Sequence, residues 1–349
     1  MSKLPQYGKI SKDFFDRVIY PNLGRRNGKV LVGPSSGVDT CVIRTGRNQV
    51  LVATTDPISF IPDLGSEYSA WQSVNLVASD LATSGLSPQF ALFDFNIPPS
   101  MKSSDFEKYW KSLICESRRL DISIVGGHTS RFEGLDSTVI GAGMMFSLGR
   151  EDECKTSQDG GVGDKVLVTK GAAIATTAVL AHAFPQTVRK KVGTKNLERA
   201  KAHLNKTTAV KDSLIAAKAG ANAMHDATEG GVLSALYELA HASKTGLRVD
   251  LERIPVSEET RDICKIFKID PYTSLSEGSL VLSCKPSRVT KVLSGLRSAG
   301  IRAAVVGELT SRKSGIVFRD CNGKESPIKY PVVDPYWRAY YDAKRRGLT

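Results

Sequence analysis

Short runs of β-branched and apolar residues alternate with stretches of helical spacing along the whole chain. In the first half the strand-like runs are residues 29–32, 40–44, 49–54, 89–95, 122–125 and 137–148. A polar, glycine-bearing stretch at 151–163 interrupts the pattern, which then restarts. This mixed order of strands and helices predicts an α+β fold in two layers. We place an N-terminal domain at 1–155 and a C-terminal domain at 156–349.

Composition limits the classes of protein that this chain can belong to. Of its 349 residues, 41% are apolar and 24% are charged, which is typical of an ordinary globular protein. The sequence contains no apolar run of the roughly 20 residues that a membrane helix requires. Its start lacks the apolar core of a signal peptide, so we expect a cytoplasmic protein without membrane contact. The six cysteines form no C-x-x-C pair, which argues against a zinc cluster or a disulfide framework.

A net charge of +12 raises the question of a nucleic-acid partner. The densest basic stretch is 186–206, where seven lysines and arginines accompany a single acid, Glu198. This stretch contains no aromatic residue on which a base could stack, which argues against nucleic acid. We interpret the stretch as a solvated helical face near an anionic substrate.

Three aspartates stand near the ends of predicted elements. Asp39 follows a glycine-bearing turn, next to Thr40, and Asp56 precedes Pro57, which we expect to end a strand. Asp80 lies in a helix that is otherwise rich in small and apolar residues, where a buried carboxylate is costly unless it is paired or ligated. Carboxylates together with phosphate oxygens are the ligands that Mg²⁺ prefers, so the three aspartates indicate a site for a magnesium–polyphosphate complex.

The segment Gly126-Gly127-His128-Thr129 follows an apolar run and is predicted to be a turn. Two glycines allow close approach of the backbone, and exposed N–H groups can form an anion-binding nest. His128 could donate to phosphate, bind a metal, act as a general base or be purely structural. The sequence leaves these roles open.

A second polar segment, 225–231, precedes a predicted helix. Thr228 or Asp226 can cap this helix, and the two glycines leave its first N–H groups open to an anion. His225 with Asp226 and Glu229 is typical of an acid/base cluster, although the same residues could simply build a tight capped loop. We take His128, His225 and Asp226 as candidate catalytic residues.

Taken together, these segments resemble the aminoimidazole ribonucleotide (AIR) synthase superfamily, and most closely its HypE-like members. The resemblance rests on motifs spread over nearly the whole chain, namely residues 37–43, 55–57, 79–82, 126–129, 225–231, 276–280 and 306–308. It implies an N-terminal domain that forms a homodimer through its strands and a C-terminal α/β sandwich-type domain with a basic helical tail. It also implies ATP and Mg²⁺ as cofactors.

By position, the resemblance assigns Asp39, Asp56 and Asp80 to Mg²⁺ and phosphate. Further nucleotide contacts are assigned to Thr40, Gly126, Gly127 and Thr129. Enzymes of this superfamily phosphorylate an oxygen or a selenide with ATP, so we expect an enzyme that phosphorylates a small anionic or amide-type substrate.

The chain departs from the family pattern at three places. Val38 stands where a paired aspartate is common, and His128 stands where HypE has an aspartate. HypE ends in a cysteine, whereas the last cysteine here, Cys321, is 28 residues upstream of Thr349. These departures favour an alternative, in which the chain is a catalytically reduced nucleotide-binding paralogue acting as a partner in a HypE-like maturation assembly.

Overall fold

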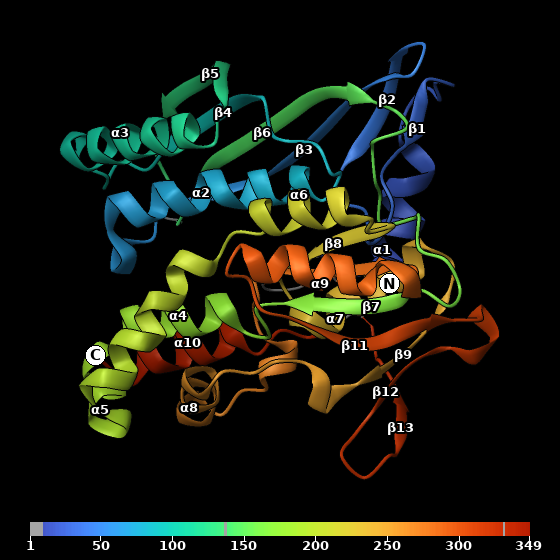
Figure 1. Ribbon diagram of the computed structural model, residues 1–349. Helices are drawn as coiled ribbons and strands as arrows, with labels where there is room; N and C mark the ends of the chain where they lie inside the picture. The colour runs from blue at the N-terminus through green and yellow to red at the C-terminus, as the bar shows by residue number, and fades with distance from the viewer. Residues whose placement is uncertain (1–9, 136–137, 331) are drawn as a thin grey trace.

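The computed structural model of the chain describes residues 10–135, 138–330 and 332–349, and it has the predicted two-domain α+β architecture (Figure 1). The N-terminal half contains β1 (Val30–Val32), β2 (Cys41–Gly46), β3 (Gln49–Ser59), β4 (Phe90–Ile97), β5 (Ser123–Arg131), β6 (Val139–Arg150) and the helices α1 (Lys12–Phe14), α2 (Gly65–Ala82) and α3 (Ser103–Arg119). The predicted hairpin of β2 and β3 is confirmed, with Val42 opposite Val52. The start of the strand predicted at 137–148 lies outside the described residues.

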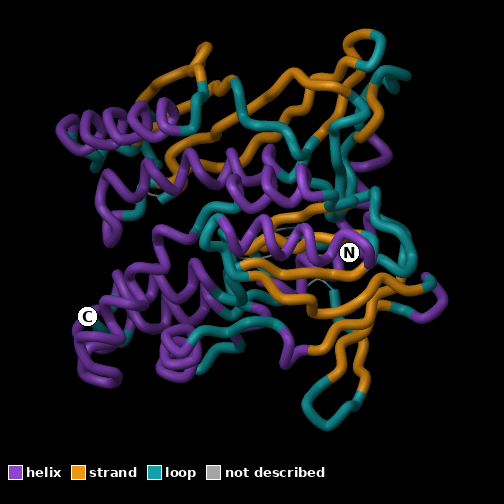
Figure 2. The backbone as a smooth tube through the Cα atoms, in the orientation of Figure 1, coloured by secondary structure: helices purple, strands orange, loops and turns teal. Residues whose placement is uncertain are grey.

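The six strands form one sheet in the order β1-β2-β3-β6-β4-β5. Helices α2 and α3 pack on one face, where Val52, Val77, Phe93 and Leu113 belong to one buried core. In the described part of the chain no helix covers the opposite face of this sheet (Figure 2). On that open face Met144 is 39% and Leu148 is 53% exposed, so the sheet presents apolar side chains to its surroundings.

One prediction about β3 is wrong. We expected Pro57 to end the strand after Asp56, but β3 continues to Ser59, with Pro57 opposite Ala142 of β6. Pairing with β2 has already stopped at Ala53, so the N–H that proline lacks has no partner strand on that side to bond. Asp56 therefore lies inside a strand, at a fixed position of the sheet.

The C-terminal half holds a seven-stranded sheet in the order β13-β12-β9-β11-β7-β10-β8. Its strands are β7 (Lys165–Thr169), β8 (Ala223–Ala227), β9 (Gly246–Asp250), β10 (Ser279–Cys284), β11 (Ala303–Thr310), β12 (Ile316–Arg319) and β13 (Glu325–Pro327). Its helices are α4 (Ile174–Ala183), α5 (Pro185–Lys201), α6 (Val210–Ala219), α7 (Gly231–Ala242), α8 (Glu258–Phe267), α9 (Val289–Ser298) and α10 (Tyr336–Arg345).

Two cores sandwich the C-terminal sheet. Helix α7 contributes Leu236 to the core on one face, and α9 contributes Leu296 to the core on the other. A third apolar cluster joins α4, α5, α8 and α10, so the basic C-terminal helix is anchored in this half. It also reaches the first half, because the Tyr340 hydroxyl donates to Asp63 over 2.6 Å.

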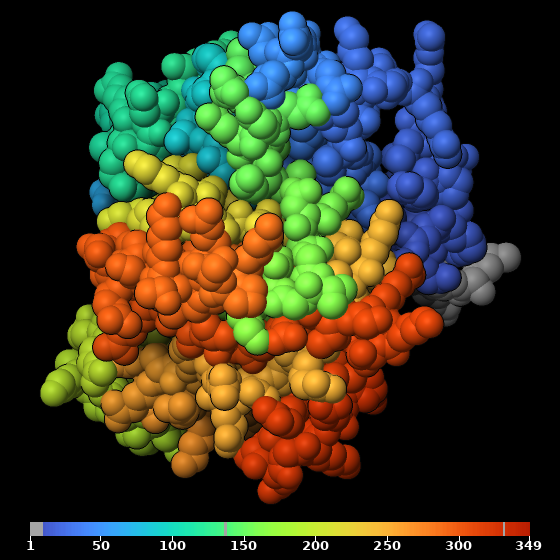
Figure 3. Space-filling model, turned by 45° about the vertical axis from the view of Figure 1, so that its right-hand side comes forward, coloured from blue at the N-terminus to red at the C-terminus, as the bar shows by residue number. Residues whose placement is uncertain are grey.

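The two domains pack directly against each other. Helix α2 lies beside α6 (Figure 1), and the backbone N–H of Ala209, which precedes α6, donates to Ser79 Oγ of α2 over 2.8 Å. The space-filling view shows continuous contact between the halves, with the segment around 151–163, drawn green, crossing their boundary (Figure 3). This packing brings Asp80, the neighbour of Ser79, to the interface between the domains.

Candidate active site

The loop that carries Asp39 docks on helix α7 of the other domain. Gly37 adopts φ +79°, and a Cβ at this position would lie 2.6 Å from the carbonyl oxygen of Glu238. Only glycine allows both this conformation and this close approach. The contact directs the half-buried Asp39 and the buried Thr40 into the space between the domains.

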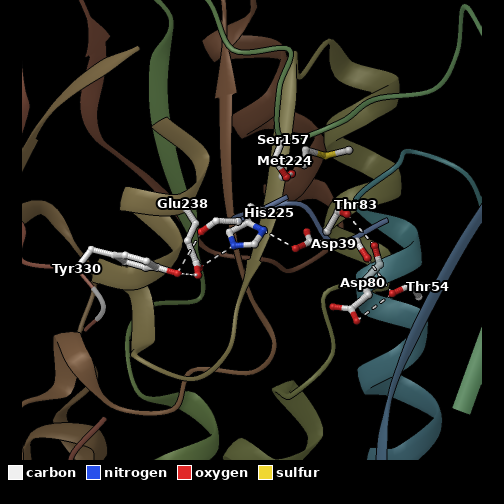
Figure 4. A network of polar contacts seen from close by, with 10 residues as sticks. Asp39, Thr54, Asp80, Thr83, Ser157, Met224, His225, Glu238 and Tyr330 are labelled. Carbon is white, nitrogen blue, oxygen red and sulfur yellow. Dashed lines mark hydrogen bonds and ion pairs between the residues drawn. The ribbon is translucent and has the colours of Figure 1, made fainter. Parts of the chain in front are cut away.

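His225 of β8 bridges two acids (Figure 4). Its Nδ1 lies 2.5 Å from Asp39 Oδ1, and its Nε2 lies 2.9 Å from Glu238 Oε2. The Tyr330 hydroxyl donates to Glu238 Oε1 over 2.8 Å and so holds that carboxylate in place. All three members of the bridge have side chains no more than 8% exposed. The bridge joins a loop of the N-terminal domain to a strand and a helix of the C-terminal domain.

The bridge fixes the charge of His225. Burial alone would lower the pKa of the imidazole, but the charges of Asp39 and Glu238 and the hydrogen bonds to them raise it well above its usual value. His225 is therefore protonated at neutral pH, with a carboxylate at each ring nitrogen. An imidazolium held in this way positions Asp39 and cannot serve as a general base.

Asp80 joins the same site from helix α2. Thr54 Oγ1 donates to the backbone oxygen of Asp39 over 2.8 Å and lies 3.4 Å from Asp80 Oδ2 (Figure 4). Asp56 follows Thr54 by two residues in β3, so both side chains lie on the same face of the sheet. The structure therefore brings Asp39, Asp56 and Asp80 to one side of the N-terminal sheet.

Acids of the C-terminal domain face these aspartates. Burial raises the pKa of Glu277 well above its usual value, and the charges of Asp334, Asp226 and Asp56 act in the same direction. These four carboxyl groups therefore lie within electrostatic range of one another. Asp334 accepts hydrogen bonds from the N–H groups of Gly230 and Tyr336, at 2.9 and 2.8 Å, while burial raises its pKa to about 6.

The donor set fits a divalent cation. Carboxylate oxygens of Asp39 and Asp226 lie within 4.8 Å of each other, and the protonated His225 beside them positions Asp39 without acting as a ligand. Asp39 Oδ2 and Glu277 Oε2 are buried and accept no hydrogen bond from any described residue. A buried carboxylate oxygen without a partner is costly. A hard cation such as Mg²⁺ prefers oxygen ligands, so it would supply the missing partner of these two carboxylate oxygens.

The prediction that residues 126–129 form a turn is wrong. Gly126, Gly127, His128 and Thr129 all lie within β5, an exposed edge strand that pairs in parallel with β4. The two glycines interrupt the apolar run, which predicted the end of the strand. Pairing with β4 nevertheless keeps the backbone extended through all four residues. His128 Nε2 lies 2.6 Å from Ser130 Oγ, where His128 is exposed and Ser130 is half-buried.

The structure does not bring these β5 residues to the acids within one chain. Asp56, Gly143, Phe93 and Gly127 stand opposite one another across β3, β6, β4 and β5. Three strand spacings separate Asp56 from Gly127, which is roughly 14 Å. Contacts from Gly126, Gly127 and Thr129 to a nucleotide, and a catalytic role for His128, therefore stay predictions.

The second predicted cluster is only partly as expected. His225 and Asp226 are neighbours in β8, but the acids that contact the imidazole are Asp39 and Glu238 rather than Glu229. Neither Thr228 nor Asp226 caps α7, because its N-cap is Gly230, whose N–H is bound by Asp334.

Sequence reasoning missed Glu238, Tyr330 and Asp334. Glu238 could have been predicted from the sequence, because an acid within the apolar run of a helix needs a buried partner. Tyr330 and Asp334 lie in a loop whose path no local pattern reveals.

Each of the two domains matches a known protein family. Residues 37–146 match the family of AIR synthase related proteins, N-terminal domain, and residues 161–320 match the corresponding C-terminal domain. The chain is 27% identical over 342 residues to the "Putative hydrogenase expression/formation protein" of Methanocaldococcus jannaschii, covering 94% of this chain and 96% of the relative. It is 25% identical over 321 residues to a selenide, water dikinase of Myxococcus xanthus, covering 82% of this chain and 87% of that protein.

A solved structure shares the fold. The crystal structure of hydrogenase maturation protein HypE in complex with ATP superposes with a TM-score of 0.64 at 18% identity, covering 91% of each chain. The described residues contain no helix that is long and apolar enough to cross a membrane.

Proposed function

Because the chain belongs to the AIR synthase related protein family, we propose that it is an ATP- and Mg²⁺-dependent enzyme that phosphorylates a small anionic or amide-type substrate. The observation that carries this proposal is the interdomain cluster of acids, in which Asp39 Oδ2 and Glu277 Oε2 are buried without a hydrogen-bond partner among the described residues. The ATP complex of a HypE of the same fold and the activity named for the selenide, water dikinase support the use of ATP.

Each domain has a defined task in this proposal. Asp39, Asp56 and Asp80 from the N-terminal domain, with Asp226 from β8, would hold Mg²⁺. When bound, the ion neutralises charge on the transferred phosphoryl group. The His225–Glu238–Tyr330 bridge keeps the Asp39 carboxylate fixed while substrate binds. Preorganised groups of this kind need no rearrangement during the reaction.

The same proposal places β5 at a homodimer interface formed by the open face of the N-terminal sheet. His128 lies on that exposed edge strand, and Met144 and Leu148 of β6, two strands away in the same sheet, present an apolar surface. Pairing of two such faces in a homodimer would bury these side chains. Residues 126–129 would then lie at the interface, where the family resemblance expects the nucleotide cleft.

A second candidate function is nucleotide binding without turnover, in a HypE-like maturation assembly. The observation that favours it is that carboxylates occupy both ring nitrogens of His225, so this predicted catalytic histidine cannot accept a proton. The name of the Methanocaldococcus jannaschii relative is compatible with such a role.

ADP release from Mg·ATP, measured alone and with a panel of phosphate-, carboxylate- and amide-bearing metabolites, separates the two functions. Turnover that is lost in Asp56→Asn supports the enzyme. ATP binding without ADP release under every condition supports the binding paralogue. Turnover that Asp56→Asn leaves unchanged would contradict the proposed site.

A further inference from the structure

A polar cavity lies in the C-terminal domain, and a layer of backbone separates it from the interdomain acids. It has a volume of about 640 Å³ and lies among α4, the segment after α5, the start of α6, the start of α8 and residues 300–302. Small-molecule sites commonly span about 300–1,000 Å³, so this cavity has room for a metabolite. None of its lining residues is Phe, Tyr or Trp, which distinguishes it from a site that stacks a nucleobase on a large aromatic ring.

Two of the cations in this cavity are neutralised locally. Lys170 Nζ lies 2.9 Å from Asp212 Oδ2 and donates to the backbone oxygens of Thr208 and Gly278, each over 2.6 Å. Arg199 Nε lies 2.5 Å from Glu259 Oε1. These pairs hold the walls in place and leave no net charge of their own.

Three further cations give the cavity its positive charge. Lys206, Lys211 and Arg302 line the cavity, and none of them forms an ion pair with an acid of the described chain. Lys211 Nζ makes only a long contact, 3.4 Å, to the backbone oxygen of Ala299. Three cations gathered at one concave surface repel each other unless an anion lies between them.

Buried polar atoms without partners also face this cavity. His203 lines it, is 2% exposed, and its Nδ1 has no hydrogen-bond partner among the described residues. Thr208 Oγ1 is buried without a partner in the same way. Burial, followed by the charge of Lys206, lowers the pKa of His203 to about 4, so at neutral pH its ring offers a neutral hydrogen bond.

We propose that this cavity is a binding site for a small polyanion, a metabolite that carries phosphate groups or several carboxylates. The three unpaired cations supply the attraction, and His203 and Thr208 supply uncharged hydrogen bonds inside the cavity. Part of the basic stretch at 186–206 thus has a specific use, because Arg199, His203 and Lys206 bring it to the cavity wall.

The polyanion site is separate from the interdomain acids but shares a wall with them. A Cβ on Gly278, next to Glu277, would lie 2.1 Å from the carbonyl oxygen of Lys206. Ala209, at the end of the same loop, bonds to Ser79 beside Asp80. An anion between Lys206 and Arg302 would therefore be one layer of backbone away from the aspartates. Its binding requires neither ATP nor Mg²⁺, so the inference goes beyond the proposed function.

The test is calorimetric titration of the full chain with inorganic pyrophosphate, and separately with citrate, in EDTA and without nucleotide. We expect saturable 1:1 binding that weakens with added salt. Lys206→Gln and Arg302→Gln should each weaken it about tenfold, because each removes a charge-assisted hydrogen bond to the anion. Lys111→Gln, the same change of charge on exposed α3 of the other domain, should leave the affinity unchanged.

Each result of the two titrations has a different meaning for the proposed site. Preference for pyrophosphate identifies a phosphate ligand, and preference for citrate identifies a polycarboxylate. Absence of saturable binding of both anions overturns the inference. So does binding that neither Lys206→Gln nor Arg302→Gln weakens, because the anion would then lie elsewhere. Both side chains are exposed, and thermal melts of the two variants check that they fold.

Discussion

Replacing Glu238 by glutamine tests the bridge between the domains. The substitution keeps the size of the side chain and an oxygen that can accept from Tyr330, but it removes the negative charge 2.9 Å from His225 Nε2. Removing one partner of a buried ion pair costs about 3–5 kcal/mol, and a hydrogen bond to a charged group contributes about 1.5–3 kcal/mol. Because Asp39 still pairs with His225, we expect a loss near the lower of these ranges, about 2–3 kcal/mol.

Urea unfolding at pH 7, followed by fluorescence and circular dichroism, measures this loss. Glu107→Gln on α3, which removes the same charge outside the bridge, is the control and should change the free energy of unfolding by less than about 0.5 kcal/mol. A Glu238→Gln variant as stable as the wild type would refute the claim that the bridge joins the domains.

The pH dependence gives a second test of the same bridge. Folding raises the pKa of His225, so the bridge contributes its full stability below the unfolded pKa of about 6.5 and loses it as the pH rises through the folded pKa. In Glu238→Gln the folded pKa falls, and this loss should begin at lower pH. NMR titration should find His225 protonated at pH 7.5 in the wild type. Titration near 6.5 there would contradict the assignment.

Three further predictions follow from other parts of the structure. Asp56→Asn should weaken Mg·ATP binding at least about tenfold while leaving the thermal midpoint near that of the wild type, and unchanged affinity in calorimetry would exclude Asp56 from the site. The folded pKa of His203, about 4, lies below the unfolded value of about 6.5, so this residue should cost about 2 kcal/mol of stability between pH 7 and pH 5. Urea unfolding of His203→Gln at both pH values should lack that part of the decrease; an identical decrease would contradict the assignment. Met144→Asp should place a charge in the open face and weaken a homodimer more than about a hundredfold, and sedimentation equilibrium that finds the same association state in both proteins would contradict a dimer through this face.

The fold was largely predictable because its signals are local. The hairpin of β2 and β3 follows from two β-branched runs around a short turn, and the largely apolar runs at 174–183 and 279–284 form α4 and β10. Errors occurred where tertiary pairing overrides local chemistry. Pro57 continues a strand because its missing N–H has no partner on that side, and residues 126–129 stay extended because β4 binds them.

The sequence could predict which segments contribute to the site, but it could not predict how their side chains contact one another. Asp80 could be selected because a buried acid among small residues needs a partner, and Asp39 and His225 because each stands in a polar segment that contains glycine. Their actual neighbours depend on how two domains pack. Glu238 comes from a helix and Tyr330 from a loop nearly a hundred residues later, and their contact, like that of Asp39 with His225, has no signature in the local sequence.

Calorimetric titration of the wild-type chain with ATP, with and without Mg²⁺, tests the central claim most directly. We expect saturable binding that requires Mg²⁺, because the acids of both domains repel a free polyphosphate and attract its magnesium complex. Absence of binding in the presence of Mg²⁺, or equal affinity without it, would contradict the proposed site between the two domains.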